Sequence, residues 1–222
     1  MPGLATLLPA GVAVAHCRGD ELPDGDLGLY PSEESIVARA VDKRRREFVV
    51  ARACARQALR RLGAPAGAIP KGSAGEPQWP PGVVGSITHC AGYTGAAVAC
   101  RSDMLAIGVD AEPNEPLPDG VLRLTAAAGE RAQLDSLAAQ DPAVHWGRLL
   151  FCAKEALFKA WYPVQQQWLG FADATIRLEP AGTFRARLTA PTPDAGRFAD
   201  CPGRWSLDGG VLLAALWLPA DE

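Results

Sequence analysis

Three groups of side chains in this sequence combine residue types and spacings that suit binding of a metal ion or a phosphate. The first is Asp110 and Glu112, at the end of the apolar run LAIGVD. Residues two apart in an extended chain project to the same side. Two carboxylates placed this way suit one Mg²⁺, which prefers one or two carboxylates together with substrate phosphates and water. Taken alone, the pair is also typical of a solvated acidic loop.

The second group is Glu155 and Lys159 in the segment FCAKEALFKAW. On a helix these two residues lie one turn apart, on the side opposite an apolar face. Taken alone, they also fit an exposed ion pair that stabilises a helix by about 0.3–0.5 kcal/mol. The apolar face consists of Trp146, Leu149, Leu150, Ala153, Leu157, Ala160 and Trp161.

The third group is basic. It comprises Arg44 and Arg52 in one predicted helix, Lys71 in a loop rich in glycine and proline, and His89 at the end of a predicted strand. Arginine suits paired hydrogen bonds with phosphate, and a loop lysine followed by glycine can approach a phosphate closely. The arginines also fit a solvated helix face, and the histidine fits an ordinary structural position. No group is decisive alone, so the interpretation depends on their combination.

A helix must carry the two arginines. Apolar residues recur at helical spacing within residues 32–62, which predicts one long helix or two abutting helices. Gly63 and Pro65 end this pattern. Residues 63–82 follow as a loop without periodicity. The apolar stripe of the helix consists of Val41, Phe48, Ala55, Leu59 and Leu62.

The remaining patterns predict strands before and after a further pair of helices. These helices are expected at residues 126–139 and 144–161. The order predicts an α+β protein of two lobes, the first formed by residues 1–103 and the second by residues 104–222. Strands are expected at residues 83–90, 94–100, 105–110, 168–178, 183–189, 204–207 and 211–218.

Composition restricts the class of protein. The 222 residues are 48% hydrophobic with a net charge of −3, which indicates a folded protein and argues against a general nucleic-acid binder. The six cysteines form no CxxC motif, so we interpret them as reduced thiols of a cytoplasmic protein without structural zinc. The apolar segment 4–15 contains Pro9 and Gly11 and fits a signal peptide poorly. The run 211–218 is too short to span a membrane.

Taken in order, the motifs resemble those of a known family. Ser86–Cys90 reads SITHC, Gly108–Glu112 reads GVDAE, and Phe151–Lys159 reads FCAKEALFK. The hallmark of the two-lobed (type II, Sfp/EntD-like) 4′-phosphopantetheinyl transferases is G-[IV]-D-x-E followed, at the separation found here, by [WF]-x-x-K-E-A-x-x-K. The resemblance covers residues 35–172 and is nearest to the actinobacterial branch. The C-terminal part of the chain carries no family motif.

This resemblance implies a fold and an activity. The fold is two pseudo-symmetric α/β lobes with the active site at their interface. The activity is Mg²⁺-dependent transfer of 4′-phosphopantetheine from coenzyme A to a serine of an apo acyl or peptidyl carrier protein, which releases 3′,5′-ADP. Mn²⁺ is the expected substitute for Mg²⁺. Fatty-acid, polyketide, nonribosomal-peptide and siderophore biosynthesis are the processes that such carriers serve, and the two-lobed length implies a monomer.

The resemblance also assigns roles to the acidic residues. Asp110, Glu112 and Glu155 are expected to hold Mg²⁺ together with the pyrophosphate of coenzyme A, and the Ala111 carbonyl is a further expected ligand. Glu155 is the expected general base for the carrier serine. Lys159 is expected to neutralise the charge that develops on the leaving phosphate.

Coenzyme A is expected to contact both lobes. Arg44 and Arg52 match positions that bind its 3′-phosphate, and Arg45 is an alternative to Arg44. Leu169 matches the position where the pantetheine arm emerges. The other expected contacts are Lys71, Gly72, Ser73 and Ala74 along the nucleotide, Thr88 and His89 at the phosphates, and Asp110, Glu155 and Lys159 beside the metal.

Two other functions use the same residue types. A Mg²⁺-dependent phosphohydrolase acting on a nucleotide would need the same carboxylates and basic residues, with water in place of a protein serine. A non-catalytic module that binds coenzyme A would be expected to lack a metal carboxylate or the helix lysine. Asp110, Glu112, Glu155 and Lys159 are all present, which favours the transferase.

Overall fold

Two antiparallel sheets and two long helices form the protein in the computed structural model, which describes residues 3–25, 27–118, 120–189 and 195–221. The helices are α1 (Leu4–Leu7), α2 (Pro31–Val37), α3 (Asp42–Leu62), α4 (Val121–Thr125), α5 (Ala128–Gln140) and α6 (Trp146–Gln165), with 3₁₀ turns η1 (Phe171–Asp173) and η2 (Ala195–Arg197). The strands are β1 (Ala13–Arg18), β2 (Val83–Cys90), β3 (Tyr93–Cys100), β4 (Met104–Pro113), β5 (Ala174–Glu179), β6 (Thr183–Leu188), β7 (Cys201–Asp208) and β8 (Val211–Pro219).

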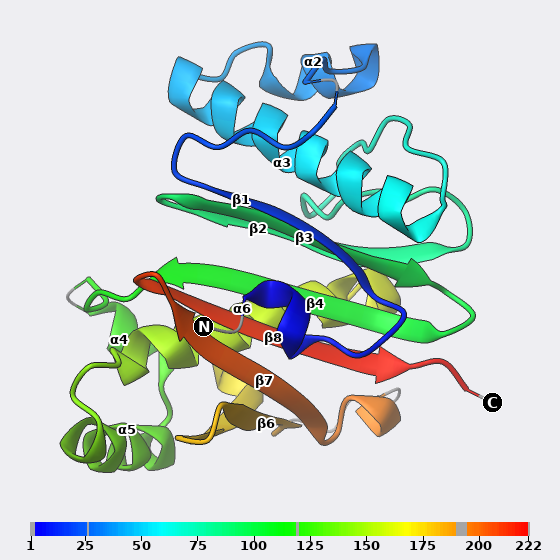
Figure 1. Cartoon of the computed structure of the whole chain (residues 1–222). Helices are drawn as coiled ribbons and strands as arrows, with labels where there is room; N and C mark the ends of the chain where they lie inside the picture. Colours follow the sequence, from blue (N-terminus) through cyan, green and yellow to red (C-terminus); the bar gives the residue numbers. More distant parts are fainter. Residues whose placement is uncertain (1–2, 26, 119, 190–194, 222) are drawn as a thin grey trace.

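The elements stack in four layers (Figure 1). Helix α3 covers one face of a three-stranded sheet with the order β1-β3-β2. The other face of that sheet packs against a five-stranded sheet with the order β4-β8-β7-β6-β5. Helix α6 covers the far face of the second sheet. The α+β architecture with two lobes that the sequence predicts is therefore confirmed.

Helix α3 packs on the first sheet through its apolar face. Phe48, Ala55 and Leu59 are buried, as the periodicity predicts. Val41 is different, because it precedes the helix and is 73% exposed. Gly63 ends the helix in the left-handed conformation, with φ of 78°, and its N–H donates to the last-turn carbonyls.

Strand β4 lies at the centre of the molecule, with a different layer on each face. Ile107, Val109 and Ala111 point into the apolar core between the two sheets. The alternate side chains, from Ala106 through Asp110, point toward α6. The predicted apolar face of α6 is buried against this side of the sheet.

Side chains from α5 cover the edge of the second sheet at β5. The Ile176 N–H donates to Glu130 Oε1 at 2.7 Å, and the Leu178 N–H donates to Gln133 Oε1 at 3.1 Å. Glu130 is in turn paired with the buried ammonium of Lys154 at 2.9 Å. Because these side chains use the free N–H groups, β5 is protected against pairing with another strand.

Several predicted boundaries differ from the observed ones. Residues 32–62 form two helices, the second of the two predicted alternatives, whereas β4 continues three residues beyond Asp110 to Pro113. The strand expected from residue 168 begins only at Ala174, after the 3₁₀ turn η1. The other expected strands and helices are confirmed, whereas α1, β1 and α4 were not predicted. Among the described residues, no helix is both long and apolar enough to cross a membrane.

Candidate active site

A cleft of about 240 Å³ opens between the lobes. Helix α3, strand β2 and the loop between them form one wall, and α6 forms the other. Seven residues predicted from the sequence line this cleft: Arg44, Arg52, Lys71, Ala74, His89, Glu155 and Lys159. The fold therefore brings the basic group and the Glu–Lys pair of α6 into one site.

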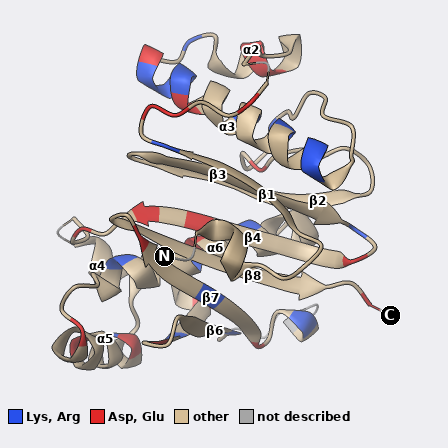
Figure 2. Ribbon diagram, viewed as in Figure 1, with Lys and Arg blue, Asp and Glu red and all other residues tan. Residues whose placement is uncertain are grey.

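Close contact between β4 and α6 determines the acidic end of the site. A Cβ atom at Gly108 would lie 1.9 Å from the Ala156 carbonyl oxygen. Only glycine lets the strand backbone come this close to the helix backbone. The approach brings Lys159 Nζ within 2.6 Å of Asp110 Oδ1. Figure 2 shows the acidic residues at the end of β4 in red.

Asp110 is the most buried carboxylate of the acidic group, with 5% of its surface exposed. Its Oδ1 accepts hydrogen bonds from Thr88 Oγ1 at 3.1 Å and from Lys159 Nζ. Its Oδ2 is buried and has no hydrogen-bond partner among the described residues. A buried carboxylate oxygen without a partner is costly, so this atom is available to a cation.

The neighbouring carboxylates are shifted toward their protonated forms. Burial and the negative charge of Asp110 raise the pKa of Glu112 and of Glu155. Burial lowers the pKa of Lys159, but the carboxylates of Asp110 and Glu155 outweigh this effect and raise it overall. Lys159 is therefore held in its charged form, and it neutralises part of the negative charge of three carboxylates.

Arg148 is a site residue that the sequence interpretation missed. Its guanidinium donates to Glu112 Oε2 at 2.9 Å and to the carbonyls of Glu115 at 3.1 Å and Pro116 at 2.6 Å. It thereby fixes both the Glu112 carboxylate and the loop that follows β4. One signal was present in the sequence, because Arg148 lies two helical turns before Glu155 on the same side of α6.

The predicted metal ligands come from adjacent segments but do not form a ready-made metal site. Among the residues that the structure describes, no cluster of three His, Cys, Asp or Glu side chains is arranged to hold a metal ion. Asp110 and Glu112 each contact a basic side chain instead. Ala111 points its methyl group into the core between the sheets. Metal binding by these residues and Glu155 stays a prediction.

The opposite wall of the cleft is a cationic site built around Phe48. The Arg52 guanidinium lies 4.2 Å from the centroid of the Phe48 ring, and Lys71 Nζ lies 5.7 Å from it. Burial lowers the pKa of Arg52 to about 10. Burial and the charges of Arg44 and Arg52 also lower the pKa of Lys71. Positive charges that destabilise one another in this way favour a bound anion.

A buried glutamate keeps Arg52 available. Glu33 is fully buried and accepts two hydrogen bonds from Arg56 Nη1, at 3.0 and 3.1 Å, and one from the Ile69 N–H. Arg52 Nε lies 3.9 Å from Glu33 and has no hydrogen-bond partner among the described residues. Glu33 thus supplies a counter-charge while leaving Arg52 Nε without a partner. The sequence interpretation did not identify it.

The structure separates the two arginines that the sequence left as alternatives. Arg44 lines the cleft, and its Nη1 lies 2.6 Å from His89 Nε2. Arg45 points elsewhere and pairs with Glu34 at 2.8 Å. Burial, together with the charge of Arg44, lowers the pKa of His89. The imidazole is therefore held in its neutral form beside the arginine.

The loop after α3 is organised around Glu76. A Cβ atom at Gly72 would lie 1.9 Å from Glu76 Oε1, so a side chain there would displace the Glu76 carboxylate. The Ala74 N–H donates to Glu76 Oε2 at 3.0 Å. Ser73 Oγ lies 3.4 Å from Tyr162 Oη, which joins this loop to α6 across the cleft.

Leu169 lies outside the main cleft. It lines a pocket of about 170 Å³ that shares Glu155 and Phe158 with the cleft. Trp168, which is 75% exposed, and Phe171 complete its apolar wall. The pocket offers an apolar continuation of the cleft along α6.

Comparison with known proteins agrees with this arrangement. The N-terminal domain of 4′-phosphopantetheinyl transferases matches residues 32–99, and the 4′-phosphopantetheinyl transferase superfamily matches residues 106–204. The transferase Svp of Streptomyces mobaraensis is 49% identical over 98% of this chain and 89% of its own. The chain belongs to the 4′-phosphopantetheinyl transferase superfamily.

Two further relatives extend over the same length. The transferase Npt of Nocardia iowensis is 46% identical over 96% of this chain and 98% of its own. The transferase PptT of Mycobacterium tuberculosis is 45% identical over 97% of both chains. A 4′-phosphopantetheinyl transferase moves 4′-phosphopantetheine from coenzyme A to a carrier protein. The predicted family is therefore confirmed, as is the predicted transfer of 4′-phosphopantetheine from coenzyme A to a carrier protein, and neither the hydrolase nor the non-catalytic module is supported.

Proposed function

We propose that this transferase is Mg²⁺-dependent and that Asp110, Glu112 and Glu155 hold the ion. The orphaned Oδ2 of Asp110 is the observation that carries this proposal. All donors are hard oxygen atoms, which suit Mg²⁺. Lys159 contacts Oδ1 of Asp110 and Arg148 contacts Oε2 of Glu112, so one oxygen of each carboxylate is free of a basic partner. When bound, the ion would neutralise charge on the phosphate oxygens of coenzyme A.

Glu155 is the proposed general base. It lines the cleft from α6, and its raised pKa improves its ability to accept a proton near neutral pH. The serine hydroxyl of the carrier protein gives its proton to Glu155 and attacks the β-phosphorus of coenzyme A. A new serine–phosphorus bond forms, the bond to the bridging oxygen breaks, and 3′,5′-ADP leaves. Lys159 stabilises the negative charge that develops on this oxygen.

The cationic wall is the proposed site for the 3′-phosphate. Arg44, Arg52 and Lys71 carry three positive charges there, and Arg52 has an unsatisfied N–H for a phosphate oxygen. His89 contacts Arg44 of this wall, and the neighbouring Thr88 donates a hydrogen bond to Asp110. These positions support contacts of both residues with the pyrophosphate. The loop from Gly72 through Ala74 would lie along the nucleotide, and Leu169 beside the pantetheine arm.

We also propose that residues 1–103 and 104–222 form the two lobes of a self-sufficient monomer. The two sheets divide the chain between β3 and β4, in support of this boundary. The six cysteines are free thiols, which supports a reducing, cytoplasmic location.

Mass spectrometry of an apo carrier protein tests the proposed function. Incubation with the enzyme, coenzyme A and Mg²⁺ is expected to add the mass of one phosphopantetheine group to the carrier. Excess EDTA is expected to abolish the addition, and Mn²⁺ to restore it. Full transfer in EDTA would contradict the metal assignment, whereas release of 3′,5′-ADP without any carrier would contradict the role of the serine.

A further inference from the structure

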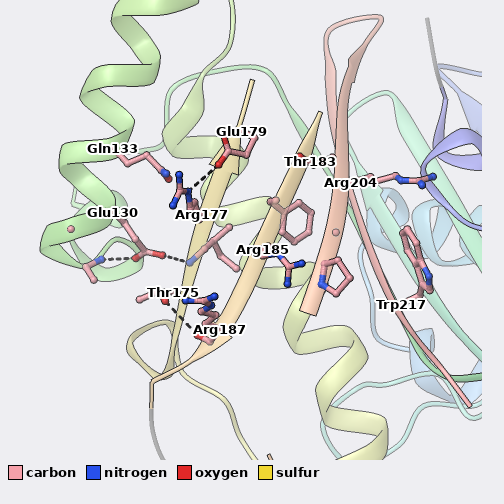
Figure 3. Close-up of a pocket in the computed structure, with 16 residues that line it drawn as sticks. Glu130, Gln133, Thr175, Arg177, Glu179, Thr183, Arg185, Arg187, Arg204 and Trp217 are labelled. Carbon is pink, nitrogen blue, oxygen red and sulfur yellow. Dashed lines mark hydrogen bonds and ion pairs between the residues drawn. The ribbon is translucent and has the colours of Figure 1, made fainter. Parts of the chain in front are cut away.

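A second concave surface, separate from the cleft, lies on the five-stranded sheet. It forms a groove of about 830 Å³ that runs from α5 across the strands to Trp217 of β8 (Figure 3). Four arginines line this basic groove: Arg177 of β5, Arg185 and Arg187 of β6, and Arg204 of β7. All four side chains are exposed. Helix α6 packs on the opposite face of the sheet.

The strand register places the arginines next to one another. Arg177 of β5 is directly opposite Arg185 of β6, and Thr175 is opposite Arg187. Arg204 is opposite Thr183, so it is diagonal to Arg185. Like charges directly opposite each other destabilise a sheet. The pairing of Arg177 with Arg185 is therefore unfavourable for the sheet itself, which is the pattern expected of a surface that binds an anionic ligand.

Carboxylates balance only part of this charge. Arg177 pairs with Glu179 at 2.9 Å, while Arg185 and Arg187 share Asp200 at 2.9 and 3.4 Å. Four guanidinium groups thus face two carboxylates, an excess of two positive charges on a chain whose net charge is −3.

Arg204 is the member with the greatest freedom to bind. Among the described residues it has no carboxylate partner, and its guanidinium lies 5.3 Å from the centroid of the Trp217 ring. A guanidinium that lies over an aromatic ring can keep its N–H groups free for other hydrogen bonds. It can therefore form paired hydrogen bonds with a carboxylate of a partner.

We propose that the basic groove binds an acidic segment of a partner protein. Contact through side chains is required, because Glu130 and Gln133 already use N–H groups at the β5 edge and so oppose strand addition. A protein segment fits better than a nucleic acid, because its acidic residues can be spaced to meet the arginines and to avoid Glu179 and Asp200, whereas a nucleic acid carries a phosphate at every nucleotide. The groove is on the face of the sheet opposite α6, whereas α6 lines the active-site cleft. A partner in the groove would therefore leave the active-site cleft open.

Fluorescence anisotropy with a labelled oligoglutamate peptide at low salt tests this proposal. The double variant Arg185→Gln/Arg204→Gln is expected to bind the peptide at least about tenfold more weakly than the unmodified chain. The matched control is Arg39→Gln/Arg101→Gln, which removes the same charge from two exposed arginines outside the groove. The control is expected to lose less than about twofold.

Three outcomes would overturn the proposal. Equal losses in the groove and control variants would show that only net charge matters. Tighter binding of an oligothymidylate with the same number of charges would assign the groove to nucleic acid. A lower melting temperature of the groove variant would show that the arginines support the sheet. An unchanged melting temperature is expected, because the variant removes the repulsion between Arg177 and Arg185 together with the exposed ion pair of Arg185 and Asp200.

Discussion

Lys159 of α6 donates a hydrogen bond to Asp110 of β4 across 2.6 Å. This contact joins the long helix of the second lobe to the strand that packs against the first. It also places the Lys159 ammonium beside Asp110, whose second carboxylate oxygen has no hydrogen-bond partner among the described residues. The lysine thus holds the Asp110 carboxylate in place through Oδ1 and leaves Oδ2 without a partner among the described residues.

Replacing this lysine should slow catalysis. Lys159→Met removes the charge that stabilises the leaving phosphate, and we expect the transfer rate to fall by about 10²–10³-fold. The rate of carrier modification at saturating coenzyme A measures this. Lys43→Met, which changes an exposed lysine of α3, should leave the rate unchanged. Similar rates in both variants would contradict the assigned role.

Gly108 should tolerate no side chain. Gly108→Ala places a methyl group 1.9 Å from the Ala156 carbonyl, so α6 must move away from β4. We expect a loss of about 1–3 kcal/mol in the free energy of unfolding, together with reduced transfer. Gly129→Ala is the control, because a Cβ atom there meets no atom within 4 Å. Denaturant unfolding should show Gly129→Ala to be at least as stable as the unmodified chain.

Arg52 and its helical neighbour Arg56 should respond differently to alanine. Arg52→Ala is expected to weaken binding of coenzyme A and to leave dephospho-coenzyme A nearly unaffected, because only the former has a 3′-phosphate. Arg56→Ala removes the two hydrogen bonds that Arg56 donates to the buried Glu33 carboxylate and should cost about 3–5 kcal/mol in stability. Calorimetric titration with both ligands, beside unfolding curves, separates the two roles. Equal losses for both ligands would make Arg52 a structural residue.

His89 should make stability depend on pH. Because burial and Arg44 lower its pKa, the unfolded chain binds more protons at pH values just below the ordinary 6.5. The free energy of unfolding should therefore fall as the pH decreases through this range. His16, whose pKa is also lowered, contributes with the same sign.

The variant His89→Gln isolates the contribution of this histidine. Unfolding by urea at about pH 7.5 and pH 5.5 should show a smaller decrease for the variant than for the unmodified chain. The carboxylates and His16 are present in both proteins, so the difference between the slopes reports His89. An equal or larger decrease in the variant would show that His89 is not held neutral.

Local patterns explain why part of the site could be predicted. Helical periodicity alone places Glu155 and Lys159 opposite the buried face of α6, and the structure has them lining the cleft. The alternation of β4 likewise places Asp110 and Glu112 on one side of the strand, and in the structure both contact side chains of α6. Both predictions depend on residues close together in the sequence.

Contacts between distant segments could not be predicted in this way. Arg148 binds Glu112 from 36 residues away, and Arg56 binds Glu33 from 23 residues away. No motif marks either pair, although Arg52 and Arg56 lie one turn apart and together require a buried counter-charge. Strand β1 was missed for the same reason, because it is short and pairs with β3 about eighty residues later in the chain.

The most direct test of the account is Glu155→Gln, measured as carrier modification by mass spectrometry beside a thermal melt. Glu155 lies opposite the buried face of α6, so the isosteric change should leave the melting temperature unaltered. As metal ligand and general base it should account for at least a hundredfold in turnover, or about 2.7 kcal/mol of barrier. As an exposed helical partner of Lys159 it would contribute only about 0.3–0.5 kcal/mol. The account predicts almost no transfer with an unchanged melt, and near-normal transfer with an unchanged melt would contradict it.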